Sequence, residues 1–371
     1  MLMVECDVVI VGAGPAGCAT ALALLGAGVE RIVLIDKPKP GSIRIGESAA
    51  PDVASTLRLL DCPAGLADRG HKPYQANLSR WAGQRRYDDF LQRASGHGWH
   101  LDRARFDQDL RDQAAQRGAR LISPAKLDSL RFQSGHWQWM VEHQQQSHEI
   151  HGRYLVDASG RQSVLARRLG VERKRFDKLT ALAWTVPNGA PLRGISMVES
   201  CAEGWWYATC LPSGEGLIAL MSDADLIRTH QRRNPDTLAQ LWQHSDELKN
   251  WLPPTDTDSI NPVAFAAHSS YLTQAVGPGW IAVGDALATF DPLASAGIAN
   301  ALGDALAAKA VILGWLHQHS LEPAETYADR ANSSLKRYLR EWRLQYGRET
   351  QWLDQPFWQR RNAGAWGVGQ A

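Results

Sequence analysis

Three glycines near the beginning of the sequence have the spacing of a phosphate-binding turn. Gly12, Gly14 and Gly17 form a GxGxxG pattern directly after the apolar stretch 7–11. The first glycine allows the chain to turn, the second lets the backbone approach a pyrophosphate, and the third lets a helix pack closely on the preceding strand. A helix that begins here, at about Pro15, directs free amide donors and the positive end of its dipole at the phosphates.

A carboxylate follows at the distance that a nucleotide-binding unit requires. Asp36 ends the next apolar stretch, 19 residues after Gly17, where its side chain can bond ribose hydroxyls. A glycine-rich turn beside a solvated aspartate is the simpler alternative. Because strand, turn, helix, second strand and acid occur in order, we interpret this stretch as a dinucleotide-binding unit.

The segments that must position this turn are not those of a simple dehydrogenase, which would continue with alternating helices and parallel strands. Residues 126–132, 136–143 and 149–157 instead predict three consecutive strands joined by short turns. Farther along, the apolar stretch 280–283 predicts another strand, and a long helix is expected from about Ser295.

Glycine and aspartate recur where two of these strands end. Asp157 and Gly160 follow one strand, and Gly284 and Asp285 follow the other. With the first turn, three strand ends that are far apart in the sequence carry the same residue types. This pattern is expected for an extended cofactor that lies across the edge of a sheet.

The complete set of motifs resembles the FAD-dependent monooxygenases of the para-hydroxybenzoate hydroxylase fold, particularly the branch that contains flavin-dependent halogenases. The resemblance covers nearly the whole chain. The motifs that carry it are GAGPAG at 12–17, IGES at 45–48, DRxxFD at 102–107, DASG at 157–160, GD at 284–285 and DPL at 291–293.

The resemblance implies FAD as the cofactor and an α/β (α+β) fold. A discontinuous, Rossmann-like FAD-binding domain would comprise 1–60, 100–170 and 265–320. A substrate domain with a mixed antiparallel sheet would comprise 61–99 and 171–264, followed by a helical segment at 321–371. The residues implied to bind the cofactor are Gly12, Gly14, Pro15, Ala16, Gly17, Asp36, Lys37, Arg44, Glu47, Ser48, Arg103, Asp157, Gly160, Gly284, Asp285, Pro292, Gly297 and Ile298.

Several of these residues have a specific implied role. Asp36 would hold the adenosine ribose, and Asp285 the ribityl chain or the pyrophosphate. Arg103 would reach the phosphates, unless it is an ordinary surface residue of the helix expected at 103–118. The amides of Gly297 and Ile298 would face the pyrimidine edge of the flavin, where a helix N-terminus stabilises the negative charge of the reduced ring.

The catalytic residues that the resemblance implies are Pro292, Ser295, Trp205 and Tyr207. Ser295 is equally well explained as the N-cap of the following helix. Trp205, Trp206 and Tyr207 are consecutive in a predicted strand, so their side chains alternate between its two faces and cannot all enter one pocket.

Two departures argue against a halogenase. That subgroup uses a lysine in an apolar segment after its GE motif, whereas the only lysine between Ser48 and Asp102 is Lys72, in the polar stretch GHKPYQ. The halogenase signature WxWxIP is replaced by WWYATCLP at 205–212. The Ser-x-Gly of halogenases is nevertheless present in DPLASAG at 291–297.

A smaller branch is more similar. The strand GWWY, the block GPGWIAVGDA and the segment FWQRR at 357–361 resemble flavoproteins that mature tryptophylquinone cofactors of lysine or glycine oxidase-type enzymes. The implied substrate is an aromatic group, free or presented as a tryptophan by a precursor quinoprotein oxidase or dehydrogenase. The implied electron source is NAD(P)H or a flavin reductase.

The aromatic residues of the C-terminal helical segment have two interpretations. Tyr338, Trp342 and Tyr346 are spaced by four and predict one buried face. Trp352 and Trp358 either belong to the core or cover the pocket, where they would meet a partner protein. Trp81 is a further candidate for the pocket wall.

Composition excludes several other classes of protein. The net charge of +1 predicts no nucleic-acid partner, and five scattered cysteines predict a reduced, cytoplasmic protein without a metal site. No membrane span is expected. The functional alternatives are a halogenase-like enzyme, a flavin-dependent reductase of the geranylgeranyl-reductase type, and a non-catalytic FAD-fold escort protein.

Overall fold

The first strand of the chain is at the centre of the larger lobe. The computed structural model describes residues 2–37, 45–62, 65–90, 96–133, 135–254 and 257–362. Strands in the larger sheet occur in the order β19-β20-β11-β1-β2-β8, with β10 and β9 continuing from β11. Their bounds are β1 Leu2–Val11, β2 Ile32–Ile35, β8 Arg120–Ile122, β9 Lys126–Gln133, β10 His136–His143, β11 Gln146–Asp157, β19 Val276–Gly277 and β20 Trp280–Ala282.

The parallel strands of this sheet end at the same edge. Val11 at the end of β1 is in register with Ile35 of β2 and with Asp157 of β11, and β20 runs parallel to β11 beside it. The three predicted strand ends with glycine and aspartate therefore lie next to one another, as the sequence pattern indicated. The antiparallel meander of β9, β10 and β11 is confirmed as well.

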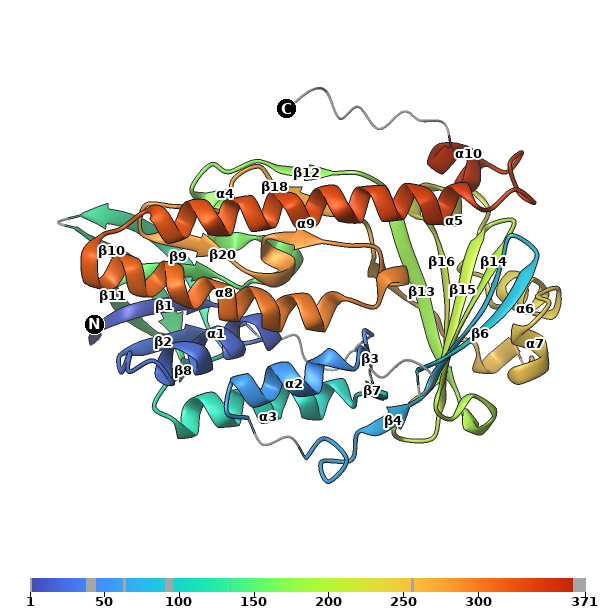
Figure 1. The fold of residues 1–371 in the computed structure, drawn as a ribbon, viewed down its shortest axis with the longest axis horizontal. Coiled ribbons are helices and arrows are strands. Elements are labelled where there is room, and N and C mark those ends of the chain that lie inside the picture. The colour runs from blue at the N-terminus through green and yellow to red at the C-terminus, as the bar shows by residue number, and fades with distance from the viewer. Residues whose placement is uncertain are drawn as a thin grey trace.

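Four helices cover this lobe: α1 Pro15–Leu25, α2 Asp52–Leu59, α3 Arg103–Gln116 and α8 Gly297–Gln318. Residues 16–24 of α1 are all buried, because this helix lies under both α3 and α8. Figure 1 shows α8 with α9 (Glu322–Gly347) on one side and α2 and α3 on the other. A helix that is apolar all round is the expected consequence of such a central position.

Among the described residues, α8 is the one helix long and apolar enough to cross a membrane. One helix of this kind is weak evidence for a membrane span, and none is expected from the sequence. The helix packs against α1, α2 and α9, so its apolarity is accounted for by its place in the core.

The smaller lobe is a seven-stranded sheet in the order β17-β13-β16-β15-β14-β5-β6. All neighbours in it are antiparallel except β14 and β5, which makes the sheet mixed, as expected. The strands are β5 Ala76–Trp81, β6 Gln84–Asp89, β13 Leu179–Val186, β14 Ile195–Cys201, β15 Gly204–Cys210, β16 Gly216–Asp223 and β17 Val263–Ala266.

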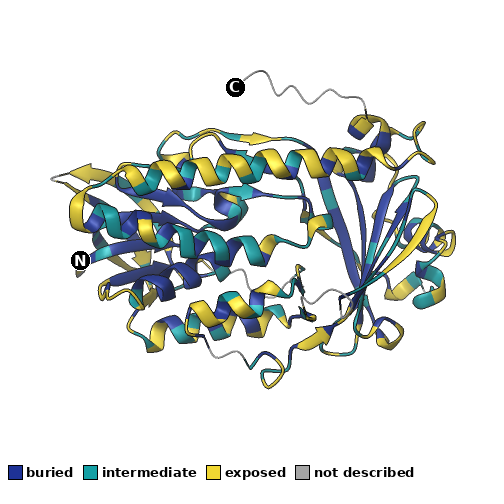
Figure 2. Cartoon of the chain, viewed as in Figure 1, coloured by how far each residue is buried: buried dark blue, intermediate teal, exposed yellow. Residues whose placement is uncertain are grey.

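Each face of this sheet has its own core. Trp184 and Trp206 lie on one face and pack with Trp242 of α6 (Pro235–Gln243), beside α7 (Leu248–Trp251). Trp205 is on the opposite face, which packs on α9 and α10 (Pro356–Asn362). In Figure 2 the central strands of this sheet are buried, whereas the edge strand β6 and the outer faces of the surrounding helices are exposed.

The helix α9 joins the two lobes. It has 26 residues and is therefore about 39 Å long. Figure 1 shows it running from the larger sheet to the edge of the smaller one, where α10 follows. Tyr338, Trp342 and Tyr346 are buried, which confirms the buried face predicted from their spacing.

Short elements complete the connection between the lobes. Two three-stranded sheets contain β3 Ser48–Ala49, β4 Lys72–Tyr74 and β7 Gly98–His100, and β12 Arg173–Arg175, β18 Ser270–Leu272 and β21 Ala288–Thr289. The remaining helices are α4 Val164–Arg168 and α5 Ala224–Thr229, together with single 3-10 turns at 160–162, 190–192, 257–259, 284–286 and 292–294.

Candidate active site

The glycine turn after β1 is closely packed at Gly12 and Gly17 and open at Gly14, between them. At Gly12, where φ is +105°, a Cβ atom would lie 2.2 Å from the Ala158 carbonyl oxygen, and at Gly17 it would lie 1.9 Å from the Gly12 oxygen. These two positions admit only glycine. A Cβ at Gly14 would meet no atom within 4 Å, so the start of α1 faces open space. This arrangement fits a pyrophosphate at the backbone amides of Gly14 and Ala16.

Asp36 and Arg111 flank this turn. The Ala13 amide donates a hydrogen bond to Asp36 Oδ1 over 3.2 Å, and Arg111 Nε donates to the Ala13 oxygen over 2.9 Å. No motif in the sequence indicates Arg111, although it lies two turns after Arg103 on α3 and thus on the same face. Lys37 follows Asp36 and is exposed, and Arg44 lies outside the described residues.

Asp157 supports the neighbouring loop. Its Oδ1 accepts hydrogen bonds from the amide and the hydroxyl of Ser159, and its Oδ2 accepts one from the Ala166 amide. Burial raises the pKa of this carboxyl. With these partners the group acts by shaping the loop, whereas Gly160 (φ +67°) has open space in front of it.

The turn at Gly284 brings the third strand end against α1. A Cβ at Gly284 would lie 2.8 Å from the Ala16 Cβ, so the two chain segments are in close contact. The Asp285 side chain remains 45% exposed, and its Oδ2 lies 3.7 Å from Arg161 Nε. Asp285 therefore has acceptor capacity left for a ligand beside the start of α1.

We expect replacement of Asp285 by alanine to weaken FAD binding about tenfold or more, because a charged acceptor of hydroxyl donors is lost. The measurement is flavin content per purified chain, followed by titration of the apoprotein with FAD. Asp329→Ala, which removes an exposed aspartate of α9, is the control and should bind FAD normally. Full occupancy in Asp285→Ala would show that this carboxylate does not contact the cofactor.

Arg103 holds the segment that contains the IGES motif. One of its terminal nitrogens donates to the carbonyl oxygens of Ile45 and Gly46, both over 3.0 Å, and the other pairs with Asp107 over 3.3 Å. The predicted contact of Arg103 with phosphate stays a prediction. What the geometry shows is that this guanidinium fixes the backbone directly before Glu47.

A buried polar chain runs from this motif into the smaller sheet. The Tyr207 hydroxyl donates to Glu47 Oε1, and it lies 2.8 Å from Ser48 Oγ. Ser48 Oγ is 3.0 Å from Ser196 Oγ, which is 3.0 Å from His100 Nε2. Burial raises the pKa of Glu47 and lowers that of His100 to about 4, so His100 is neutral at physiological pH. No local pattern in the sequence indicates Ser196 or His100.

Trp205 is part of a second buried network, centred on Asp291. Trp205 Nε1 donates to the Tyr346 hydroxyl over 2.9 Å, and that hydroxyl donates to Asp291 Oδ2 over 2.7 Å. Trp342 Nε1 donates to the same oxygen over 3.2 Å, while Asp291 Oδ1 accepts from the Leu293 amide. Burial raises the pKa of Asp291 to about 6. The network ties the loop after Asp291 to both α9 and the smaller sheet.

The loop from Pro292 to α8 has an unusual backbone. Pro292 opens a 3-10 turn, and Ser295 follows in the left-handed region with φ +46°. The N-cap of α8 is Ala296, so the interpretation of Ser295 as that cap is wrong. At Gly297 an added Cβ would meet nothing within 4 Å, whereas Ile298 is buried. No side chain caps the start of α8, and the predicted contact of the Gly297 and Ile298 amides with the flavin stays a prediction.

One apolar cluster unites the three parts of the site. Ile45 from the IGES segment, Leu293 from the loop after Asp291, and Tyr207 from β15 all pack into the cluster that contains Trp205. Tyr207 and Trp205 thus lie on the same face of the sheet, as their alternation predicted. Tyr207 contacts Glu47 of the IGES motif directly, whereas Trp205 is connected through Tyr346 to Asp291.

The C-terminal aromatic residues are core residues. Trp81 Nε1 donates to the Gln345 carbonyl, and the Trp81 ring packs against those of Tyr346 and Trp358. Trp358 is fully buried and donates to the Cys201 carbonyl. The suggestion that Trp358 meets a partner protein is therefore wrong, because α10 folds back on the sheet.

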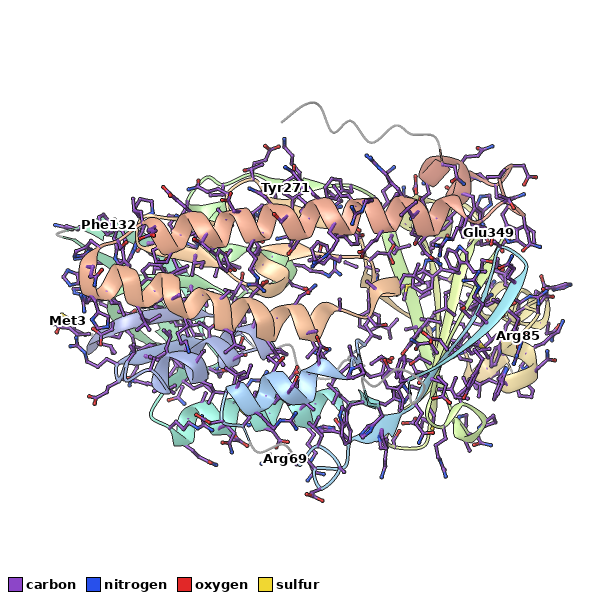
Figure 3. The ribbon with its side chains drawn as sticks, viewed as in Figure 1. Met3, Arg69, Arg85, Phe132, Tyr271 and Glu349 are labelled. Atoms are coloured by element: carbon purple, nitrogen blue, oxygen red, sulfur yellow. The ribbon has the colours of Figure 1, made fainter. Side chains whose placement is uncertain are left out.

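Glu349 secures the corner between α9 and α10. It is fully buried and accepts hydrogen bonds from the Ala82 amide over 2.7 Å and from Ser200 Oγ over 2.6 Å. Figure 3 shows Glu349 where α9 reaches the smaller sheet. The aromatic face of the two helices is thereby closed against β5 and β14.

Two further kinds of chemistry would require a group of metal ligands or a lysine close to the cluster around Tyr207. Among the described residues, no three histidine, cysteine or carboxylate side chains are grouped as a metal site requires. Lys72 is exposed on β4, in the small sheet with β7, and does not join the apolar cluster around Tyr207.

Known proteins match this chain over most of its length. The model of the FAD binding domain family matches residues 5–341. A protein of Marinomonas mediterranea named as an FAD-dependent oxidoreductase, LodB, is 30% identical over 96% of this chain and 97% of its own length. The flavin-dependent halogenase gsfI of Penicillium aethiopicum is 28% identical over 82% of this chain, which spans only 63% of gsfI.

A solved structure of known function also matches this chain over nearly its whole length. It is titled as the peptidyl tryptophan dihydroxylase QhpG, essential for tryptophylquinone cofactor biogenesis, and superposes with a TM-score of 0.78. The match has 27% sequence identity and covers 99% of this chain and 80% of QhpG. The chain belongs to the FAD binding domain family and is an FAD-dependent oxidoreductase of the halogenase-like branch of the para-hydroxybenzoate hydroxylase fold.

Proposed function

We propose that this protein is a monooxygenase that hydroxylates a tryptophan side chain presented by a precursor quinoprotein. The observation that carries the proposal is the likeness to QhpG, which extends over 99% of the chain at 27% identity. The motifs GWWY, GPGWIAVGDA and FWQRR of this chain support it further, because they resemble those of flavoproteins that mature tryptophylquinone cofactors.

The site is suited to such a reaction. Reduced FAD supplies electrons to oxygen, and the protein's task is to orient the aromatic group and to exclude water. Ile45, Leu293 and the ring of Tyr207 supply an apolar surface beside the predicted flavin edge. The buried carboxyl of Glu47 and the hydroxyl of Tyr207 provide a hydrogen-bonding pair that can exchange a proton at that surface.

We expect the FAD-loaded enzyme to add mass in oxygen increments to one tryptophan of an unmodified tryptophylquinone precursor. The assay supplies a reductant and oxygen, and the product is located by tandem mass spectrometry of the precursor's peptides. Asp285→Ala without FAD is the negative control. Reductant oxidation should couple more closely to product when the precursor is present, because the bound tryptophan displaces water.

The alternatives predict different products. A halogenase would brominate an indole when bromide is supplied, and would lose that activity in Lys72→Ala. We expect no bromination, and unchanged hydroxylation in Lys72→Ala, since this lysine is exposed on β4. Efficient hydroxylation of a free aromatic compound without any response to the precursor would refute the protein-borne substrate, and reduction without oxygen uptake would favour a reductase.

A further inference from the structure

A cavity of about 450 Å³ lies between α8 and α9. Residues of α8, α9, β18 and the segment that follows the Gly284 turn line it. Figure 1 shows α9 and α2 on opposite sides of α8. None of the residues that leave open space for the cofactor, Gly14 and Gly297 among them, lines this cavity. It is therefore separate from the site described above.

The helices give the cavity an elongated shape. Arg330 and Arg337 are two turns apart on α9, which separates them by about 10 Å along the helix axis. Asn300 and Asp304 are one turn apart on α8. All four side chains line the cavity. A pocket of this volume matches a small organic molecule rather than a single ion.

The two ends of the cavity differ in the charge of the side chains that line them. At one end, Arg330 lies 3.5 Å from Asp304, whose Oδ2 also accepts a hydrogen bond from the Gly284 amide over 3.2 Å. Arg337, at the other end, forms no ion pair or hydrogen bond within the described part of the chain. The cavity thus has one cation in excess, and a monoanion would neutralise it.

Aromatic and aliphatic side chains form much of the remaining wall. Phe290 stacks on Tyr338 with ring centroids 4.4 Å apart, and Tyr271 stacks on Phe176 at 5.2 Å. Phe290 and Tyr271 both line the cavity, together with Leu287. Figure 3 shows Tyr271 beside α9. An occupant therefore needs an apolar body as well as its negative charge.

We propose that this cavity is a second ligand site, which binds an elongated organic monoanion with an aromatic or aliphatic body. The acidic group pairs with Arg337, and the body lies between Phe290 and Tyr271 and extends toward Asn300. Leu287, which lines the cavity, follows the Gly284 turn in the sequence. The occupant therefore lies close to a segment that is predicted to bind the cofactor. The proposal does not depend on the reaction assigned to the enzyme.

The test is calorimetric titration of the FAD-saturated protein with 8-anilinonaphthalene-1-sulfonate, an aromatic monoanion. The neutral N-phenyl-1-naphthylamine serves as the comparison ligand. We expect one sulfonate per chain, weaker binding of the neutral compound, and about tenfold weaker sulfonate binding in Arg337→Gln. Ala331→Trp, which fills the cavity, should abolish binding.

Arg340→Gln is the matched control, because Arg340 is an exposed arginine of the same helix that does not line the cavity. It should leave sulfonate binding unchanged. FAD content and circular dichroism verify that each variant is folded, and the exposed Arg337→Gln keeps the test decisive if Ala331→Trp does not fold. The proposal is overturned if wild-type protein gives no binding, or if Arg337→Gln binds as wild type does.

Discussion

Replacement of Gly12 by alanine is expected to abolish FAD binding and to lower the free energy of unfolding by several kcal/mol. The new Cβ would lie 2.2 Å from the Ala158 oxygen, a backbone atom at the end of β11 that cannot move without disturbing the sheet. The φ of +105° adds strain, because only glycine adopts such values freely. Equilibrium unfolding in denaturant and flavin content of the purified variant measure both effects.

The variant Gly28→Ala separates the effect of the steric clash from the effect of backbone strain. Gly28 also has a positive φ, +86°, but an added Cβ would meet no atom within 4 Å. This control should cost about 1–2 kcal/mol from backbone strain and keep its FAD. The assignment of the turn would be refuted by a Gly12→Ala protein that carries FAD in stoichiometric amount.

Replacement of Asp291 by asparagine is expected to destabilise the fold by about 1–3 kcal/mol and to change how stability depends on pH. Trp342 Nε1 and the Leu293 amide can only donate, and they donate to different oxygens of Asp291. An asparagine amide has one oxygen, so one of these buried donors is left facing an NH₂ group. The free energy of unfolding, measured in denaturant at several pH values, shows both effects.

The sign of the pH effect follows from the raised pKa of Asp291. Its folded value of about 6 exceeds the ordinary 3.8, so the folded state binds a proton more tightly than the unfolded chain. Stability from this group is therefore largest below about pH 4 and falls by roughly 3 kcal/mol as the pH rises through 6. The slope should be smaller in Asp291→Asn.

Glu341→Gln is the control for this pH effect, because Glu341 is an exposed carboxylate on α9, the helix that carries Trp342 and Tyr346. Its slope should equal that of the wild type, since the other buried carboxyls remain. An Asp291→Asn protein with the wild-type slope would show that Asp291 is ionised in both states over this range.

The sheet edge where the three strand ends meet was predictable from the sequence, because it depends on local signals. Glycine at Gly12 and Gly17 is required by close contacts within one turn, and Asp36 and Asp285 follow directly after apolar strands. The same holds for the alternation that places Trp205 and Tyr207 on one face. Such features need only the periodicity of the strand and the geometry of the turn.

The partners of these residues could not be predicted in the same way. Trp81 bonds to Gln345 and Trp205 to Tyr346, partners that are 264 and 141 residues apart in the sequence. A spacing of four on α9 shows that Tyr346 is buried, but it does not show which strand covers it. The two interpretations of Trp358 could not be separated from the sequence, because an aromatic residue looks the same in a core and in an interface.

The position of α9 and α10 has a consequence for how the enzyme is made. Both helices follow every strand of the two lobes in the sequence, and yet they supply Tyr346 and Trp358 to the cluster around Trp205. While the chain is still on the ribosome, the inner face of the smaller sheet is exposed until these helices emerge.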